Sequence, residues 1–246
     1  MATSPQLNKF IQDAERSYQG SFSAFDREAQ KGGATTLGLR AGGSCFSASH
    51  RHVSGSDRVE VQGALKIERL PRRRRETNPS AQGRINVLLS SRDVYGFIGP
   101  PSIHTKQLRE SYVSVAYYVQ KKAIWQTKLA IHYDYNQRGA TQAHPIFHAQ
   151  LGNGALGKNL VSLAGVPSVI EEIVDPLSTV RLPTAGMIGA TALLKLAADH
   201  LSHSSFLVVL DSLRKPAFFK HWSCDHTTLD IPPHPPNAVG WYSTKT

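Results

Sequence analysis

The sequence predicts an α+β fold, in which an antiparallel sheet meander has an N-terminal helix and C-terminal helices packed on it. Three observations predict this class. Apolar residues recur at helical spacing at the start of the chain, apolar and polar residues alternate in its middle, and helical spacing returns in its last third. Strands that precede the later helices, rather than alternating with them, favour α+β over α/β.

The first predicted element is a helix at residues 4–30. Ser4 suits the N-cap position and Pro5 suits the first turn. The apolar face of the helix is formed by residues three and four positions apart: Leu7, Phe10, Ile11, Ala14, Tyr18, Phe22 and Phe25. Gly32 and Gly33 are expected to end the helix, because glycine readily adopts the left-handed conformation found there.

The next part of the chain is predicted to be irregular at first and then to form short strands. Residues 34–57 are rich in Gly and Ser, which is typical of irregular segments. A strand follows, because four apolar residues share one parity: Val59, Val61, Leu65 and Ile67. Residues 68–84 are predicted to be a basic loop. Two short strands are then expected at 85–90 and 93–98.

Three strands are predicted in the middle of the chain. Residues 111–120 are rich in Val and Tyr, and residues 123–135 alternate apolar and polar side chains. The short Lys121-Lys122 connection between them predicts an antiparallel hairpin. A third strand at 144–151 completes a meander with one buried face.

The last third of the chain is predicted to be helical. A short helix is expected at 168–174, and a longer one is expected to begin at Thr184. Residues 204–213 fit either a helix or a buried strand. From Pro216 the chain is expected to be mostly irregular, with a Pro-rich tail at 230–246. The length suits one large domain or two small ones and favours neither; we expect a single domain over residues 1–246.

The formal net charge is +10, from 28 Lys and Arg against 18 Asp and Glu. This balance favours a polyanionic partner, with nucleic acid first and acidic proteins or membrane surfaces second. The predicted nucleic-acid-binding residues lie in and before the basic loop: Lys66, Arg69, Arg72, Arg73, Arg74 and Arg75. Aromatic residues of the hairpin are candidate stacking surfaces for bases or, alternatively, core residues: Tyr112, Tyr117, Tyr118 and Trp125. Alternatively, the basic loop is a solvent-exposed surface loop that binds no partner.

A cluster of histidines is the candidate catalytic site. In the strand at 123–135, His132 and Asp134 have the parity opposite to Ile131, Tyr133 and Tyr135. If this strand pairs with the next one, the polar groups gather on one sheet face: His132, Asp134, His144, His148 and Gln150. Imidazoles and a carboxylate supply acid–base groups or ligands for a divalent metal. The alternative is a set of cross-strand hydrogen bonds on a half-wet face.

A second cluster gathers thiols with imidazoles, which are zinc ligands. Each cysteine lies within five residues of two histidines, which gives six candidate metal ligands in two halves: Cys45, His50, His52, His221, Cys224 and His226. If the two halves meet, they form a metal site. The alternative is that they are ordinary loop residues, since the spacing matches no standard finger.

Several familiar motifs are absent from the sequence: the GxxxxGK[ST] phosphate loop, a GxGxxG after a strand, GxSxG and HExxH. The first ten residues show no charged-then-apolar signal pattern, and apolar runs such as 206–210 are too short to span a bilayer. Two cysteines imply no disulfide framework. We therefore expect a cytoplasmic protein that does not enter a membrane.

Three short motifs carry a resemblance to other proteins. They are His132-Tyr-Asp134-Tyr, His144-Pro-Ile-Phe-His148-Ala-Gln150-Leu-Gly152 and Arg181-Leu-Pro183-Thr184-Ala-Gly-Met187. Over residues 110–200 the chain resembles uncharacterised bacterial proteins with an HPxFHxQ strand, of the mobile-element or phage-defence type. The resemblance implies a role in antiviral defence and no particular activity.

Three functions are therefore predicted. The first is nucleic-acid binding, as a subunit of a bacterial defence or mobile-element assembly. The second is a histidine- or metal-dependent phosphodiester hydrolase (nuclease) that uses the histidine cluster. The third is a non-enzymatic interaction protein or homo-oligomer, in which the extended segment at 231–242 docks on a partner or on its own domain.

Overall fold

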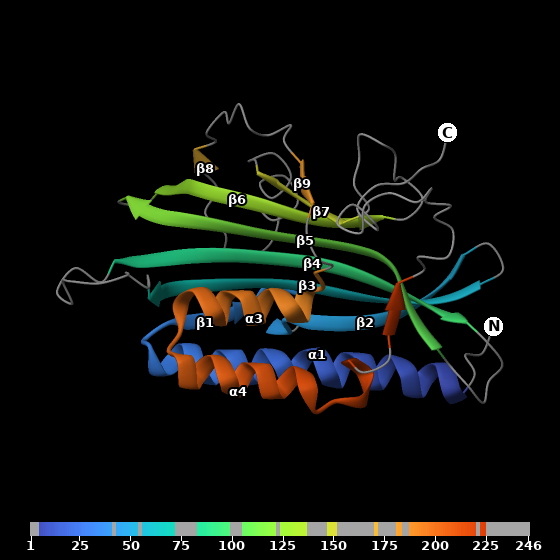
Figure 1. Ribbon diagram of the computed structural model, residues 1–246. Helices are drawn as coiled ribbons and strands as arrows, with labels where there is room; N and C mark the ends of the chain where they lie inside the picture. The colour runs from blue at the N-terminus through green and yellow to red at the C-terminus, as the bar shows by residue number, and fades with distance from the viewer. Residues whose placement is uncertain are drawn as a thin grey trace, which may run out of the picture.

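The computed structural model describes residues 5–40, 43–53, 56–71, 83–98, 105–121, 124–136, 147–151, 170–171, 181–183, 187–219 and 222–224. Within them, three helices lie against one face of a long antiparallel sheet (Figure 1). This confirms the predicted α+β class. No helix in these ranges is long and apolar enough to cross a membrane. The Pro-rich tail at 230–246 lies outside the described residues.

The N-terminal helix is confirmed as α1, Pro5–Lys31. Leu7, Ala14, Tyr18 and Phe25 of the predicted apolar face are buried. At the end of the helix, Gly33 has φ 77°, a left-handed conformation that favours glycine. The carboxylate of Glu28 is also buried; it accepts hydrogen bonds from Lys31 Nζ at 2.7 Å and from Ser205 Oγ at 3.0 Å.

The segment at 34–57 was expected to be irregular, and this prediction is wrong. It contains β1 (Thr35–Gly38) and β2 (Phe46–Val53), which both pair antiparallel with β3 (Ser56–Pro71). Both strands have many half-exposed or exposed residues, so their side chains show no clear apolar alternation. They form because β3 is long enough to pair with both of them on one edge.

Three long strands form the middle of the sheet: β4 (Arg84–Ile98), β5 (Thr105–Lys121) and β6 (Ile124–Asn136). β4 replaces the two predicted short strands, because Ser91 and Arg92 continue its pairing with β3. The expected loop at 68–84 is also too long, since β3 runs to Pro71 and β4 begins at Arg84. A bulge between Ile67 and Leu70 interrupts the register there, with Arg69 at φ 61°.

Four shorter strands complete the sheet: β7 (Phe147–Leu151), β8 (Ile170–Glu171), β9 (Arg181–Pro183) and β10 (Trp222–Cys224). The main path has the order β1-β3-β4-β5-β6-β7-β9, with β2, β8 and β10 paired beside it. The predicted meander β5–β6–β7 is therefore confirmed. The helix expected at 168–174 is wrong at residues 170–171, where the backbone pairs with β6.

The C-terminal helices are α3 (Gly189–His200) and α4 (His203–Arg214), followed by a 3-10 turn at Ala217–Phe219. α3 begins five residues later than the predicted cap at Thr184, which lies outside the described residues. The structure decides that residues 204–213 are helical rather than a strand. Ser202 caps α4 by accepting a hydrogen bond from the backbone N–H of Ser205.

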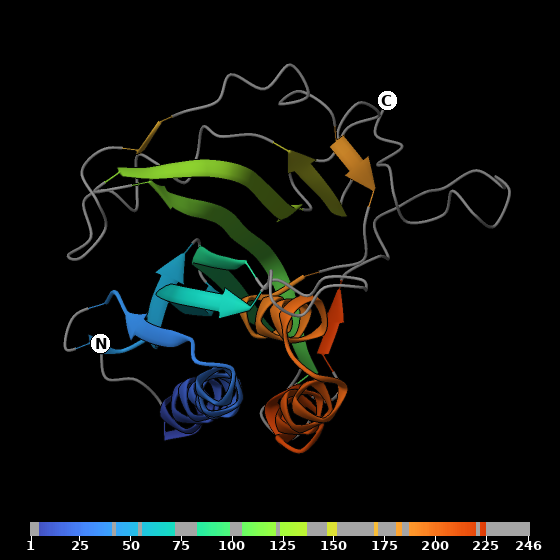
Figure 2. The same cartoon turned by 90° about the vertical axis from the view of Figure 1, so that its left-hand side faces the viewer.

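The main core lies between the sheet and the helices. α3 lies directly on β3, β4 and β5, while α1 and α4 lie side by side beneath it (Figures 1 and 2). Aromatic rings from separate elements meet near the middle of α1; Tyr18 lies 5.2 Å from Phe46 and Tyr95 lies 5.2 Å from Phe218. Only glycine fits at positions 63 and 189, because a Cβ at either position would collide with Phe46 or Ser91.

A buried carboxylate joins the elements of this core. Asp93 on β4 is fully buried and accepts hydrogen bonds from Tyr18 Oη at 2.7 Å, Ser111 Oγ at 2.6 Å and the backbone N–H of Gly189 at 2.8 Å. Burial raises the pKa of Asp93 to about 6, although these three hydrogen bonds favour the charged form. Asp93 therefore connects α1, β4, β5 and the first turn of α3.

Candidate functional site

The face of the sheet that points away from the helices carries a band of polar side chains, which we call the polar face. Strand parity assigns its members, because the apolar residues between them belong to the helix-facing core. Its described members include Arg51, Arg58, Glu60, Gln62, Arg92, Glu110, Tyr112, Ser114, His132, Asp134 and Gln150. A small buried apolar cluster adjoins the band on the same face and includes Ala64, Leu88 and Ala116.

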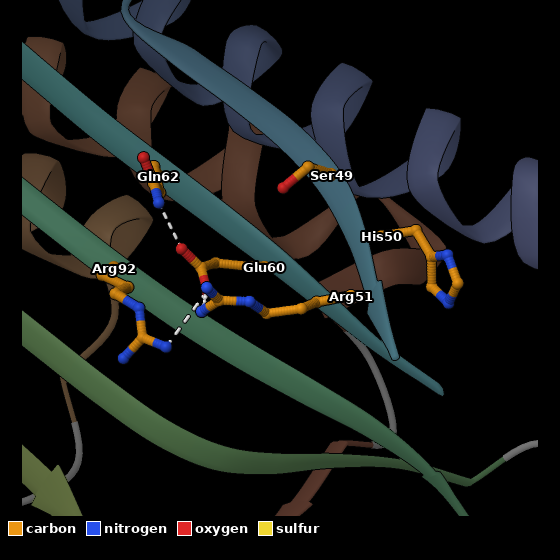
Figure 3. A pocket seen from close by; sticks show the side chains of 6 residues that line it. All are labelled: Ser49, His50, Arg51, Glu60, Gln62 and Arg92. Atoms are coloured by element: carbon orange, nitrogen blue, oxygen red, sulfur yellow. Dashed lines mark hydrogen bonds and ion pairs between the residues drawn. The ribbon is translucent and has the colours of Figure 1, made fainter. Parts of the chain in front are cut away.

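Arginines and glutamates alternate across β2–β5 on the polar face, and Figure 3 shows Arg51, Glu60 and Arg92 of this set. Arg92 donates through Nη2 to Glu60 Oε2 at 3.0 Å and through Nη1 to Glu110 Oε2 at 3.1 Å. Arg51 lies 3.7 Å from Glu60, and Arg58 lies 3.6 Å from Glu110. Three guanidinium groups therefore share two carboxylates, which leaves one positive charge in excess.

The contacts between Glu60 and Arg92 favour the charged form of both side chains. Burial alone would raise the pKa of Glu60, but hydrogen bonds from Arg92 and Gln62 hold that pKa below its ordinary value. Burial would lower the pKa of Arg92, and its bonds to Glu60 and Glu110 raise it instead. Glu60 and Arg92 are therefore both charged at neutral pH.

The cluster borders an open pocket of about 440 Å³, lined by Ser49, His50, Arg51, Glu60, Gln62 and Arg92 (Figure 3). This volume lies within the range of pockets that hold small organic ligands, about 300–1,000 Å³. Arg40 Nη1 donates to Gln62 Oε1 at 2.8 Å and so fixes one wall of the pocket. The side chain of Arg51 is 66% exposed, so its charge is accessible from solvent.

An aromatic ring lies next to the cluster. The guanidinium carbon of Arg92 is 5.9 Å from the ring centroid of Tyr112, which is half-buried. Tyr117 and Tyr118 are buried, at 7% and 1% exposure, so their predicted role as stacking surfaces is wrong and the core alternative holds. The side chain of Trp125 lies outside the described residues.

The predicted pairing of the histidine-bearing strands is present. β6 and β7 pair antiparallel, with His132 opposite Gln150 and Asp134 opposite His148. His132 Nδ1 forms a hydrogen bond with Ser114 Oγ, and its buried Nε2 has no hydrogen-bond partner among the described residues. Burial lowers the pKa of His132, against the smaller effect of the Asp134 charge. His144 and the side chain of His148 lie outside the described residues.

The basic residues predicted to bind nucleic acid are only partly described. Arg72, Arg73, Arg74 and Arg75 lie outside the described residues. Lys66 is largely buried, at 14% side-chain exposure, and pairs with Glu68 at 2.9 Å, so its charge is already compensated. Arg69 is exposed. Sequence reasoning missed Arg84, which is exposed beside it and donates to the backbone carbonyls of Arg69 and Gly32.

The predicted thiol-containing metal site is not assembled by the described residues. Cys45 is buried, and burial, followed by the charge of Asp26, raises its pKa to about 12. Cys224 lies on β10, which pairs with β5, and β4 and β3 separate β5 from the strand of His50. At about 4.8 Å per strand, the backbones of Cys224 and His50 are about 19 Å apart. His221 and His226 lie outside the described residues.

Two of the predicted metal ligands do come together, with a third residue that was not predicted. His50 Nε2 and His52 Nδ1 lie 2.9 Å and 2.8 Å from Asp57 Oδ1. Their hydrogen bonds hold the pKa of Asp57 below its ordinary value, with that from His52 the larger effect. The Ser54-Gly55 dipeptide between His52 and Asp57 is a turn signal that would have identified this hairpin from the sequence.

The chain matches no protein-family model, no curated protein and no solved structure. The resemblance to bacterial proteins with an HPxFHxQ strand therefore stays a prediction. What this protein does has to be inferred from the residues of the polar face and of the β2–β3 hairpin.

Proposed function

We propose that this protein binds nucleic acid across the polar face of its sheet, with single strands bound best. The observation that carries this proposal is the set of three arginines, Arg51, Arg58 and Arg92, that outnumber two glutamates beside Tyr112. Guanidinium groups pair with phosphates in a bidentate way, and a tyrosine ring offers a surface on which a base stacks. The net charge of +10 attracts the phosphate backbone at longer range.

The carboxylates of the cluster support binding rather than opposing it. Glu60 and Glu110 hold the Arg92 side chain by both of its terminal nitrogens, so little conformational entropy is lost when a phosphate arrives. Arg51 is bound most loosely, at 3.7 Å, and is the most exposed of the three arginines. Arg51 is therefore the arginine most available to a phosphate.

A second basic surface lies where β3 ends and β4 begins. Arg69 and Arg84 are exposed there, and the arginines at 72–75 follow directly after Pro71 in the chain. We propose that this basic surface adds further phosphate contacts. A cytoplasmic location and membership of a bacterial defence or mobile-element assembly are proposed with it.

The test of the proposal compares two arginines of equal charge on opposite faces. Arg51→Ala removes a guanidinium from the pocket, whereas Arg16→Ala removes an exposed one from α1. We expect Arg51→Ala to weaken binding to a single-stranded oligonucleotide several-fold and to reduce the salt dependence by about one phosphate contact. Equal affinities and salt slopes for the two variants would refute the proposed interface.

A second function, phosphodiester hydrolysis, is favoured by the His132 environment. The lowered pKa keeps the imidazole neutral at pH 7, Ser114 binds one ring nitrogen, and the other has no hydrogen-bond partner among the described residues that would occupy it. A neutral, oriented imidazole is a competent general base. His132→Ala should then abolish cleavage of the bound strand while the melting temperature and the binding affinity are retained. Undiminished cleavage by this variant would exclude the histidine as a catalytic residue.

A further inference from the structure

The tip of the β2–β3 hairpin carries two imidazoles and one carboxylate on one face. His50 and His52 are two positions apart on β2, so their side chains point to the same side of the strand. Asp57 on β3 lies directly opposite His52 in the register, and His50 lies opposite Val59. The three ligand atoms lie within 4.8 Å of one another.

This group lies on the opposite side of β2 from the arginine–glutamate cluster. His50 shares its parity with the core residues Phe46 and Ala48, whereas Arg51 points to the polar face. Figure 3 shows the His50 ring turned away from the Glu60–Arg92 pair. The arginine–glutamate cluster and the hairpin histidines therefore lie on opposite sides of the same strand, and His50 also borders the pocket.

The distances between the three atoms suit a small divalent cation. Zinc and its neighbours bind imidazole nitrogen and carboxylate oxygen at about 2.0–2.1 Å. Two ligands of such an ion are then about 2.9 Å apart at a right angle and about 3.4 Å apart at the tetrahedral angle that zinc favours, by simple geometry. The two nitrogens lie 2.9 Å and 2.8 Å from Asp57 Oδ1, which is close to both separations.

We propose that His50, His52 and Asp57 bind a divalent first-row transition metal of the zinc type. The ion replaces the protons that now join each imidazole to Asp57, and it is held by His50 Nε2, His52 Nδ1 and Asp57 Oδ1. Imidazole with one carboxylate favours zinc, nickel, copper or iron over magnesium or calcium, which prefer all-oxygen sites. Three protein ligands leave at least one position for water or another ligand.

The hairpin itself gives the site its rigidity. The register is continuous from Val53 opposite Ser56 to Phe46 opposite Gly63, so all three ligands sit on paired backbone. The site is also open, since the side chains of His50, His52 and Asp57 are 25%, 53% and 50% exposed. A metal can therefore enter without unfolding, and its remaining coordination positions face solvent.

The test uses the full-length chain without an affinity tag, stripped of metal with a chelator and titrated with Zn²⁺ by calorimetry. We expect one Zn²⁺ per chain, with affinity reduced at least tenfold in His52→Ala and in Asp57→Asn. His203→Ala, which removes an exposed histidine on α4, is the matched control and should bind as the wild type does. Asp57→Asn is isosteric and lies at an exposed position, so it reports on the ligand rather than on folding.

Imidazole nitrogen resonances provide a second readout that does not depend on affinity. Zn²⁺ should shift the Nε2 resonance of His50 and the Nδ1 resonance of His52, and leave that of His203 unchanged. Unaltered Zn²⁺ affinity in both ligand variants would overturn the proposal. Loss of Zn²⁺ binding in Cys45→Ser or Cys224→Ser would overturn it as well, because it would place the metal on the thiols.

Discussion

Replacing Asp93 tests whether a buried carboxylate holds the core together. In Asp93→Asn, the amide oxygen can accept the hydrogen bonds from Tyr18 and Gly189, and the amide nitrogen can donate to Ser111. The Ser111 hydroxyl already lies 2.6 Å from the carbonyl of Met187, so it can donate there instead. The isosteric change therefore keeps each hydrogen bond of the network and removes only the charge. In Asp93→Ala, in contrast, Ser111 can donate to Met187 and Tyr18 can donate to Tyr95, 2.7 Å away, but the backbone N–H of Gly189 loses its acceptor.

The magnitude follows from the raised pKa. The pKa of Asp93 is about 6 in the folded protein, against 3.8 ordinarily, a difference of about 2 units. At 1.36 kcal/mol per unit, this corresponds to about 3 kcal/mol of unfolding free energy. Between pH 3.8 and about pH 6, Asp93 is protonated in the folded state but ionised in the unfolded state. The contribution of Asp93 to stability is therefore fully present below pH 4 and is lost as the pH rises through 6.

Urea unfolding of the wild type and of Asp93→Asn between pH 3.5 and 7.5 measures this difference. Subtracting the two profiles removes the effect of other acids, such as Glu28 and Glu60, whose pKa values are lowered. We expect the wild type to lose about 3 kcal/mol relative to Asp93→Asn over this range. Parallel profiles would refute the reasoning. Asp93→Ala should lose about 1–3 kcal/mol more, because the buried Gly189 N–H is left unpaired.

Three other predictions concern packing, thiol reactivity and stacking. Gly189→Ala should lower the unfolding free energy by about 1–3 kcal/mol in urea titrations, because the new Cβ would collide with Ser91. An unchanged midpoint would contradict the close approach of α3 to β4. In a Cys224→Ser background, Cys45 should react with iodoacetamide at pH 8 at least about 100-fold more slowly than a free thiol, because it is buried and its pKa is raised. Rapid labelling would contradict its burial. Tyr112→Ala should weaken oligonucleotide binding by about 1–3 kcal/mol, whereas Tyr112→Phe should bind as the wild type does; equal binding by both variants would exclude stacking.

The spacing of apolar residues identified the helices and strands that have one face in the core and the other face away from it. α1 and the β5–β6–β7 meander were predicted correctly, because Tyr133 and Tyr135 face the core while His132 and Asp134 face away from it. β1 and β2 were missed, since side-chain alternation is weak where strands are largely exposed. Their formation depends on backbone pairing with β3, which the sequence of the segment at 34–57 does not reveal.

Buried polar residues explain another part of what the sequence did not reveal. Ser91 and Asp93 occupy core positions of β4, where the sequence predicted a break at 91–92 and a second strand that began at Asp93. A carboxylate at such a position is stable only with partners from distant parts of the chain, here Tyr18 and Gly189. Asp57 was likewise not linked to His50 because their proximity depends on the register of a hairpin.

The central claim is that the polar face of the sheet binds nucleic acid. Its most direct test is the affinity of the wild-type chain and of Arg51→Ala for a fluorescent single-stranded oligonucleotide, measured from low to physiological salt. We predict that affinity falls steeply with salt for the wild type and that the slope is smaller by about one for Arg51→Ala. Absent binding, or binding that neither salt nor the substitution affects, would contradict the claim.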